Sequence, residues 1–270
     1  MKAELPPVTL SEHEGVRYLH LGSIWVQGAM RIRQPQVVEL DYIQRMLAAL
    51  LWLPTESLSQ GHAVQLGLGA GALTRFTQQQ LKMRTTAVEL NRLVVMVCKQ
   101  WFHLQTDDPR LTVATMDAGV WIREHAPAQS VQLLFVDMYD DDAAAPVFDD
   151  EAFYADCRRA LAPGGVMSVN LFGRHASYAH SAARVAAVFG TEQVWSLRPT
   201  REGNTALIAT REVVVPGRDE LTARANDIEA RFGDLGLKAK KWLHWVRPYQ
   251  AQAKASAAEN AAVTATASMP

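Results

Sequence analysis

Three glycines lie at the end of one apolar run, and an acid ends the next run along the chain. The first run spans residues 63–67, its glycines are Gly67, Gly69 and Gly71, and Glu89 follows about twenty residues after the middle glycine. Glycine permits a tight turn and close approach of a ligand, while the following helix aims its N–H groups at that ligand. A carboxylate at the next strand end can accept both ribose hydroxyls. The pattern is typical of a site for an adenosine-containing cofactor.

The glycines alone leave two cofactor classes open. Gly67 and Gly69 with Ala72 also satisfy the dinucleotide pattern, with alanine in its last place. Asp117 and the adjacent Ala118 follow the third apolar run, where a carboxylate can accept from the adenine amino group. This favours an adenosylmethionine-type site over a dinucleotide site. Asp117 is equally suited to cap the following helix, and the two roles are compatible.

A second acidic feature follows the fourth apolar run. That run, 132–137, ends at Asp137, and Asp140, Asp141 and Asp142 follow in a short loop. Clustered carboxylates beside a cofactor pocket suit a protonated amine or a divalent metal. No histidine or glutamate stands at metal-ligand spacing, so we expect an amine and no metal. We expect Asp141 and Asp142 to be solvated loop residues.

Alternating strands and helices position these side chains. We expect strands at 63–67, 84–88, 111–115, 132–137 and 165–170, and helices at 72–81, 91–102, 118–125, 150–162 and 176–189. This alternation predicts a parallel sheet with helices on both faces, whose ligands bind at the carboxyl ends of the strands. The glycines, Glu89, Asp117 and Asp137 all fall at such ends.

The flanking regions have different patterns. At the N-terminus we expect a loose arm at 1–15, a hairpin of 16–21 and 24–28, a third short strand within 29–32, and a helix at 40–53. Towards the C-terminus we expect a hairpin of 193–197 and 205–210 with an antiparallel strand at the sheet edge, a helix at 219–232, and a frayed or disordered tail at 250–270.

Bulk properties exclude several classes of function. The 270 residues are 49% hydrophobic and carry a formal net charge of −1, which argues against binding nucleic acid or anionic membranes. No apolar run is long enough for a transmembrane helix, and the N-terminus is not a secretory signal. We expect Cys98 and Cys157 to be reduced, buried thiols and the protein to be cytoplasmic.

Taken together, these residues resemble the spermidine synthase family of polyamine aminopropyltransferases. The match runs from about Arg17 to Arg211 and includes Gln27 in the hairpin, Tyr42 in the first helix, the glycine loop, Glu89, Asp117, Asp137 and Asp140. The resemblance implies an α/β Rossmann-like methyltransferase fold, with a mostly parallel seven-stranded sheet whose last strand is antiparallel. It also implies a small N-terminal β-hairpin domain and a homodimer. We expect an N-terminal arm, hairpin and linking helix at 1–53, a catalytic domain at 54–249 and a flexible tail at 250–270.

The family's roles carry over by position. They imply transfer of an aminopropyl group from decarboxylated S-adenosylmethionine to a di- or polyamine, a small-molecule amine. The roles are Asp137 as base beside Tyr42, Asp140 for the far amine, Glu89 for the ribose, Asp117 for the adenine, and Gln27, Gly67, Gly69, Gly71 and Ala118 around the cofactor.

The sequence departs from the family in the amine half of the site. Ala70 stands where the family's glycine loop carries an aspartate that contacts the donor's ammonium group. Asp141 replaces the proline after the second aspartate, and Ile43 and Gln44 replace a frequent His-Glu pair. Two alternatives therefore stay open: a methyltransferase that uses S-adenosylmethionine itself, and a non-catalytic protein that retains the nucleoside pocket.

Overall fold

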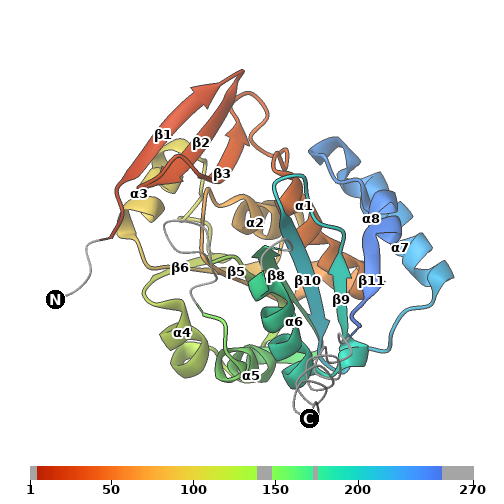
Figure 1. The fold of residues 1–270 in the computed structure, drawn as a ribbon. Helices are drawn as coiled ribbons and strands as arrows, with labels where there is room; N and C mark the ends of the chain where they lie inside the picture. Colours follow the sequence, from red (N-terminus) through yellow and green to blue (C-terminus); the bar gives the residue numbers. More distant parts are fainter. Residues whose placement is uncertain (1–4, 139–147, 173–175, 251–270) are drawn as a thin grey trace, which may run out of the picture.

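The computed structural model describes residues 5–138, 148–172 and 176–250. These residues form two β-sheets and the helices around them (Figure 1). A three-stranded antiparallel sheet holds β1 (Val8–His13), β2 (Val16–Leu21) and β3 (Val26–Arg31). An eight-stranded sheet has the order β11-β9-β10-β8-β7-β4-β5-β6.

The N-terminal sheet is larger than the predicted hairpin. Within the arm expected to be loose, β1 pairs with β2 through a two-residue turn at Glu14 and Gly15, whose φ angles are 49° and 77°. Val8 and Leu10 alternate with polar residues and pack on the core, so the prediction of a loose arm was wrong for this segment. The strand predicted separately within 29–32 is the continuation of β3.

The helix expected at 40–53 changes its geometry midway. It is an α-helix, α1 (Asp41–Met46), followed by a 3₁₀ segment, η1 (Leu47–Trp52). Every residue of η1 is buried. Because all six residues are apolar and buried, the segment has no polar face. Pro54 follows shortly after the segment ends.

The large sheet has the predicted Rossmann-like methyltransferase arrangement. Its first five strands are parallel: β4 (His62–Leu66), β5 (Arg84–Glu89), β6 (Leu111–Thr115), β7 (Val131–Val136) and β8 (Leu161–Phe172). Its last three are β9 (Val194–Leu197), β10 (Asn204–Thr210) and β11 (Val246–Pro248).

The antiparallel strand of the predicted hairpin, β10, is not at the sheet edge, where we expected it. β10 runs antiparallel to both neighbours and lies between β8 and β9. Its residues from Thr205 onward are buried. An interior position keeps their apolar side chains away from water and gives their backbone groups hydrogen-bond partners on both sides. The expected seven strands are present, and the short β11 adds an eighth at the edge.

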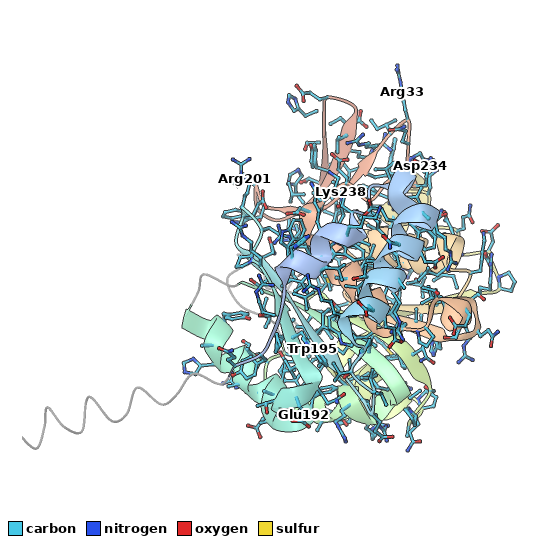
Figure 2. All side chains as sticks on the ribbon, turned by 90° about the vertical axis from the view of Figure 1, so that its right-hand side faces the viewer. Arg33, Glu192, Trp195, Arg201, Asp234 and Lys238 are labelled. Atoms are coloured by element: carbon cyan, nitrogen blue, oxygen red, sulfur yellow. The ribbon has the colours of Figure 1, made fainter. Side chains whose placement is uncertain are left out.

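Helices cover both faces of the large sheet. One face carries α1, α2 (Ala72–Arg75), α7 (Arg218–Phe232) and α8 (Ala239–Trp245), and Figure 2 shows the blue α7 and α8 facing the viewer. The other carries α4 (Ala118–Val120), α5 (Glu151–Ala160) and α6 (Ala176–Phe189). Single π-helical turns, Phe76–Gln80 and Trp121–His125, extend α2 and α4. Within the described ranges, no helix is both long and apolar enough to cross a membrane.

The N-terminal sheet is joined to the large sheet by α3 (Arg92–Trp101) and by a close contact at the glycine loop. A Cβ atom on Gly28 would lie 2.4 Å from the Cβ of Ala70 and 2.5 Å from its backbone nitrogen. Neither neighbour is a flexible side-chain end, so only glycine fits here without moving the backbone. Cys98 of α3 lies in this core, and both cysteines are buried and free.

Gly28→Ala should therefore destabilise the protein, by roughly 1–3 kcal/mol, because β3 and the glycine loop must separate. Urea unfolding followed by circular dichroism measures the change. Gly233→Ala is the control, since φ is −60° there and a Cβ would meet only the Glu229 side chain, at 3.6 Å. Equal stability of the two variants would contradict the close packing at Gly28.

Candidate functional site

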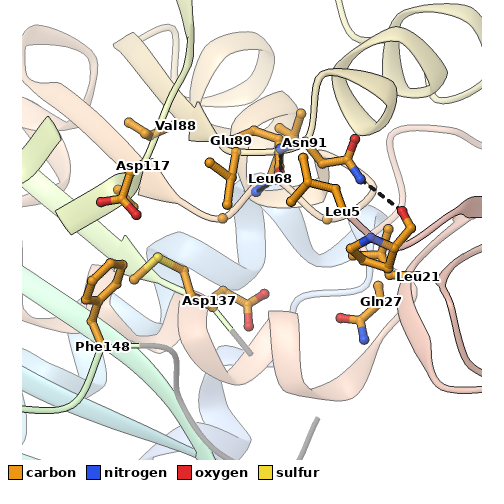
Figure 3. A pocket seen from close by; sticks show the side chains of 16 residues that line it. Leu5, Leu21, Gln27, Leu68, Val88, Glu89, Asn91, Asp117, Asp137 and Phe148 are labelled. Atoms are coloured by element: carbon orange, nitrogen blue, oxygen red, sulfur yellow. Dashed lines mark hydrogen bonds between the residues drawn. The ribbon is translucent and has the colours of Figure 1, made fainter. Parts of the chain in front are cut away.

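A cavity of about 230 Å³ opens where β4, β5, β6 and β7 end (Figure 3). Seven of the residues predicted for the site line it: Gln27, Gly67, Gly69, Glu89, Asp117, Ala118 and Asp137. Apolar side chains, among them Leu5, Leu68 and Phe148, supply much of the remaining wall. Leu5 belongs to the predicted loose arm, and the side-chain amide of Asn91 donates to the carbonyl of Pro6 at 3.2 Å, which fixes that segment beside the cavity.

The glycine loop is confined by two other stretches of backbone. Gly67 has φ of 85°, and a Cβ there would lie 2.1 Å from the carbonyl oxygen of Asp137. Gly69 has φ of 52°, and its Cβ would lie 2.7 Å from the carbonyl oxygen of Gln27. Gly71, at φ 70°, precedes the first turn of α2 and is not part of the cavity wall. Gly67 and Gly69 are therefore needed for two reasons: their φ angles are positive, and neighbouring carbonyl oxygens leave no room for a side chain.

Gln65 supports the loop from beneath, and we did not predict this role. Its side-chain amide donates to the carbonyls of Gly67 at 2.7 Å and Leu68 at 3.2 Å, and its side-chain oxygen accepts from the Thr74 hydroxyl. Gln65 is 2% exposed. A glutamine inside an apolar strand is the signal that marks it, because a buried amide needs partners.

Arg75 and Cys98 hold the other end of the loop. The Arg75 guanidinium donates to the carbonyls of Ala70 at 2.7 Å and Phe102 at 2.8 Å, and burial lowers its pKa to about 10. The Cys98 thiol donates to the carbonyl of Gly69 at 3.1 Å, and burial raises its pKa to about 12. Both side chains stabilise the backbone of the loop from outside the cavity.

Glu89 places a buried carboxyl group at the end of β5. Its two oxygens accept from the backbone N–H groups of Leu68 at 3.0 Å and Asn91 at 2.8 Å. Burial raises the pKa of Glu89, while these backbone hydrogen bonds lower it. Each oxygen keeps acceptor capacity, so the carboxylate can also bind a vicinal diol.

Asp117 has the capping role that the sequence allowed. One of its oxygens accepts from the N–H of Val120 at 2.8 Å, at the start of α4. Figure 3 shows the same carboxyl group facing the cavity between Val88 and Phe148. A Cβ on Gly119 would lie 2.7 Å from the Phe148 ring, so glycine lets this aromatic wall approach the helix. A carboxyl beside an aromatic face suits a heterocycle with an amino group.

Asp137 is a partly buried acid whose two carboxylate oxygens are both held by side chains. The Tyr42 hydroxyl donates to one of its oxygens at 3.2 Å, and the Asn170 amide donates to the other at 2.9 Å. The Asn204 amide in turn donates to the Asn170 side-chain oxygen at 3.1 Å. Burial raises the pKa of Asp137, while the bonds from Asn170 and Tyr42 lower it.

Asn170 and Asn204 were absent from the predicted site. Asn170 interrupts an apolar strand, which is a signal for a buried polar role. The sequence does not identify its partners, because β8 and β10 meet Asp137 only through the order of strands in the sheet.

Tyr42 does not line the 230 Å³ cavity, but its hydroxyl is hydrogen-bonded to Asp137, which does. It lines a crevice of about 10 Å³ beside Ala70, which is 3% exposed. Gln27, Gly69 and Asp137 belong to both walls, so the two spaces adjoin. The predicted substrate-binding residue Asp140 lies outside the described residues, as do Asp141 and Asp142.

The ionisable side chains in the described lining of the cavity are all acidic. Among the described residues that line it, Glu89, Asp117 and Asp137 carry carboxyl groups and none is lysine or arginine. Carboxyl groups converging on a partly apolar cavity favour a cationic ligand.

Comparisons with known proteins agree with this geometry. No family model matches the chain. The polyamine aminopropyltransferase of Chromobacterium violaceum is 30% identical over 231 residues, covering 85% of this chain and 86% of that protein. The polyamine aminopropyltransferase of Neisseria meningitidis serogroup B is 29% identical over 234 residues, covering 86% and 87%.

Solved structures show the same fold. A probable spermidine synthase from Corynebacterium glutamicum superposes with a TM-score of 0.67 at 19% identity, covering 92% of this chain and 94% of that one. Human methyltransferase-like protein 13, solved with SAH, gives 0.62 at 22%, covering 82% and 100%. The Thermotoga maritima spermidine synthase gives 0.54 at 14%, covering 84% and 87%. The fold, and the similarity to these relatives over most of both chains, show that this chain is a transferase that belongs to the polyamine aminopropyltransferase family.

Proposed function

We propose that this protein transfers an aminopropyl group from decarboxylated S-adenosylmethionine to a di- or polyamine, with Asp137 as the base. The observation that carries the proposal is the cavity at the strand ends, which is lined by three carboxyl groups, one of them that of Asp137. The names of the relatives from Chromobacterium and Neisseria support the same reaction.

The charge of the cavity favours the decarboxylated donor. S-Adenosylmethionine carries a carboxylate that needs a cationic or N–H partner, and the described lining supplies no lysine or arginine. The decarboxylated donor carries a sulfonium and an ammonium group, both attracted by Glu89, Asp117 and Asp137. Ala70 removes one attractive group from the family pattern, but it is buried against Gly28, outside the wall of the larger cavity.

In this proposal, residues at different strand ends bind different parts of the donor. The Glu89 carboxylate binds the ribose hydroxyls, and Asp117 accepts from the adenine amino group beside Phe148. Gly67 and Gly69 let the donor approach the backbone, and Gln27 faces the space beside Asp137.

Asp137 performs the proton transfer in this proposal. An alkylamine is protonated at neutral pH, with a pKa of about 10. Asp137 accepts a proton from it, and the free nitrogen lone pair attacks the methylene carbon next to the sulfonium. The C–N bond forms as the C–S bond breaks, and neutral methylthioadenosine leaves. Tyr42 and Asn170 fix both carboxylate oxygens, so the base needs no rotation before reaction. Asp140 remains the proposed partner of the far amine.

The direct test is incubation of the purified protein with putrescine and either sulfonium donor, followed by chromatography of the nucleosides. We expect methylthioadenosine and an aminopropylated amine from the decarboxylated donor, and no turnover of S-adenosylmethionine. Formation of S-adenosylhomocysteine would instead support a methyltransferase. Binding of methylthioadenosine without turnover of any diamine or polyamine would support a non-catalytic nucleoside-binding protein.

Asp137→Asn should lower kcat by about 10²–10⁴-fold while leaving the affinity for methylthioadenosine within a few-fold of the parent. The variant should also be more stable at neutral pH. Because burial raises the folded-state pKa, the ionised carboxylate costs stability above that pKa, and the cost vanishes below the unfolded pKa of about 4.

Urea unfolding measured across pH checks the stability part of this prediction. Asp108→Asn is the matched control, since Asp108 lies outside the cavity and its pairing with Arg110 lowers its pKa to about 2. That variant should keep full activity and lose stability at neutral pH. Full activity of Asp137→Asn would exclude this residue as the base.

Tyr42→Phe should shift the acidic limb of the kcat/KM profile to higher pH. The Tyr42 hydroxyl donates to the Asp137 carboxylate and lowers its pKa, so removing it raises that pKa further. Rates measured between pH 5 and 9 test the shift, with Tyr18→Phe in β2 as the control. An unmoved acidic limb would show that this limb does not report Asp137.

A further inference from the structure

A second concave region lies towards the β11 edge of the large sheet, where β9, β10 and β11 meet α6 and α8. It encloses about 490 Å³. Its polar wall consists of Tyr178, Ser196, Arg198, Thr205, His244 and Arg247. We call this region the β9–β11 groove. It shares no lining residue with the nucleoside cavity.

The side chains of the groove are hydrogen-bond donors. The guanidinium groups of Arg198 and Arg247 can only donate, and the hydroxyl groups and the imidazole can each donate as well. Among the described lining residues there is no carboxylate and no side-chain amide. A wall with two fixed cations and no acid favours a ligand that accepts hydrogen bonds and carries negative charge.

The backbone around Arg198 is held in place before any ligand binds. Its N–H donates to the carbonyl of Trp245 at 3.0 Å, and its carbonyl accepts from the guanidinium of Arg45. That guanidinium also lies 4.5 Å over the Trp245 ring and pairs with Asp41 at 2.8 Å. Since Asp41 neutralises Arg45, the charge presented to the groove comes from Arg198 and Arg247.

The Thr205 hydroxyl is the second, independent observation. Thr205 is 2% exposed and lines the groove, yet its hydroxyl has no hydrogen-bond partner in the described part of the chain. Leaving a buried hydroxyl unpaired is unfavourable, so such a group usually has a partner. The Tyr178 hydroxyl, which also lines the groove, bonds to Ser196, and burial raises its pKa.

We propose that the β9–β11 groove binds a small organic oxyanion carrying phosphate or carboxylate groups. Arg198 and Arg247 supply the charge, and Thr205 supplies a buried donor. The volume is within the range of about 300–1,000 Å³ found for small-molecule sites. The proposal does not depend on the aminopropyl transfer proposed above.

The groove adjoins the hydrogen-bond network around Asp137 through β10. Thr205 follows Asn204, and consecutive strand residues point to opposite faces of a sheet. Asn204 bonds to Asn170, which bonds to Asp137. A ligand in the groove therefore contacts the residue next to the one that begins this chain of hydrogen bonds.

Isothermal titration calorimetry of the full-length chain with inorganic tripolyphosphate and with citrate tests the proposal in low-salt buffer. We expect saturable binding of at least one probe at one molecule per chain, and the two arms distinguish a phosphate ligand from a carboxylate ligand. Arg198→Ala and Arg247→Ala should each weaken binding at least tenfold.

Arg201→Ala is the matched charge control. Arg201 is exposed on the turn between β9 and β10, and Figure 2 shows its side chain directed away from the protein. The Arg201→Ala substitution removes the same charge from the same edge of the sheet but outside the groove. The affinity of this variant for the bound probe should therefore stay within twofold of the parent. Tripolyphosphate and citrate that fail to saturate, or equal affinities of the Arg198, Arg247 and Arg201 variants, would overturn the proposal.

Thr205→Val separates a ligand donor from an unused hydroxyl. The substitution keeps the branched shape and removes a group that bonds to no described residue, so the melting temperature should not fall. The affinity for the bound probe should fall at least threefold. Unchanged affinity in a folded Thr205→Val protein would refute the assignment of this hydroxyl to a ligand.

Discussion

The close approach of three backbone segments is the constraint on which the site depends. The glycine loop lies against the carbonyl of Asp137 on one side and against the backbone of Gln27 and Gly28 on the other. A side chain on Gly28, Gly67 or Gly69 would push these segments apart and change the shape of the cavity. The N-terminal sheet is thus part of the binding site, because β3 forms one boundary of the loop. Gln65 and Arg75 complete this arrangement by bonding to loop carbonyls from below.

Two acids of the cavity, Glu89 and Asp137, are held in different ways. Backbone N–H groups hold Glu89, and these remain whatever side chains the neighbouring residues carry. Side chains hold Asp137, and each can be changed by substitution. The electrostatics of the proposed ribose site therefore follow from the fold, while those of the proposed base follow from Tyr42 and Asn170. This difference parallels the sequence, in which the nucleoside half keeps the family pattern and the amine half departs from it.

The predictable features were those with local signals. The strand ends that carry Glu89, Asp117 and Asp137 follow from apolar runs and from the rule that parallel strands share a rim. Asn204 could not be predicted, because its role depends on β10 inserting between β8 and β9, and a hairpin pattern does not specify which strand takes the interior position. The first strand was missed for a related reason: Val8 and Leu10 alternate weakly and need α3 as a packing partner.

The position of β10 has a consequence for the order in which the protein is made. The described residues that line the cavity at the strand ends occur between Leu5 and Phe148, so they leave the ribosome before Asn170 and well before Asn204. A chain made only as far as Phe148 therefore has these wall residues but lacks Asn170, one of the two described donors to Asp137. The later segment orders that donor only when β10 inserts beside β8. The part of the chain after Phe148 thus supplies Asn170 and Asn204 of the network around Asp137, after the described residues of the cavity wall have been made.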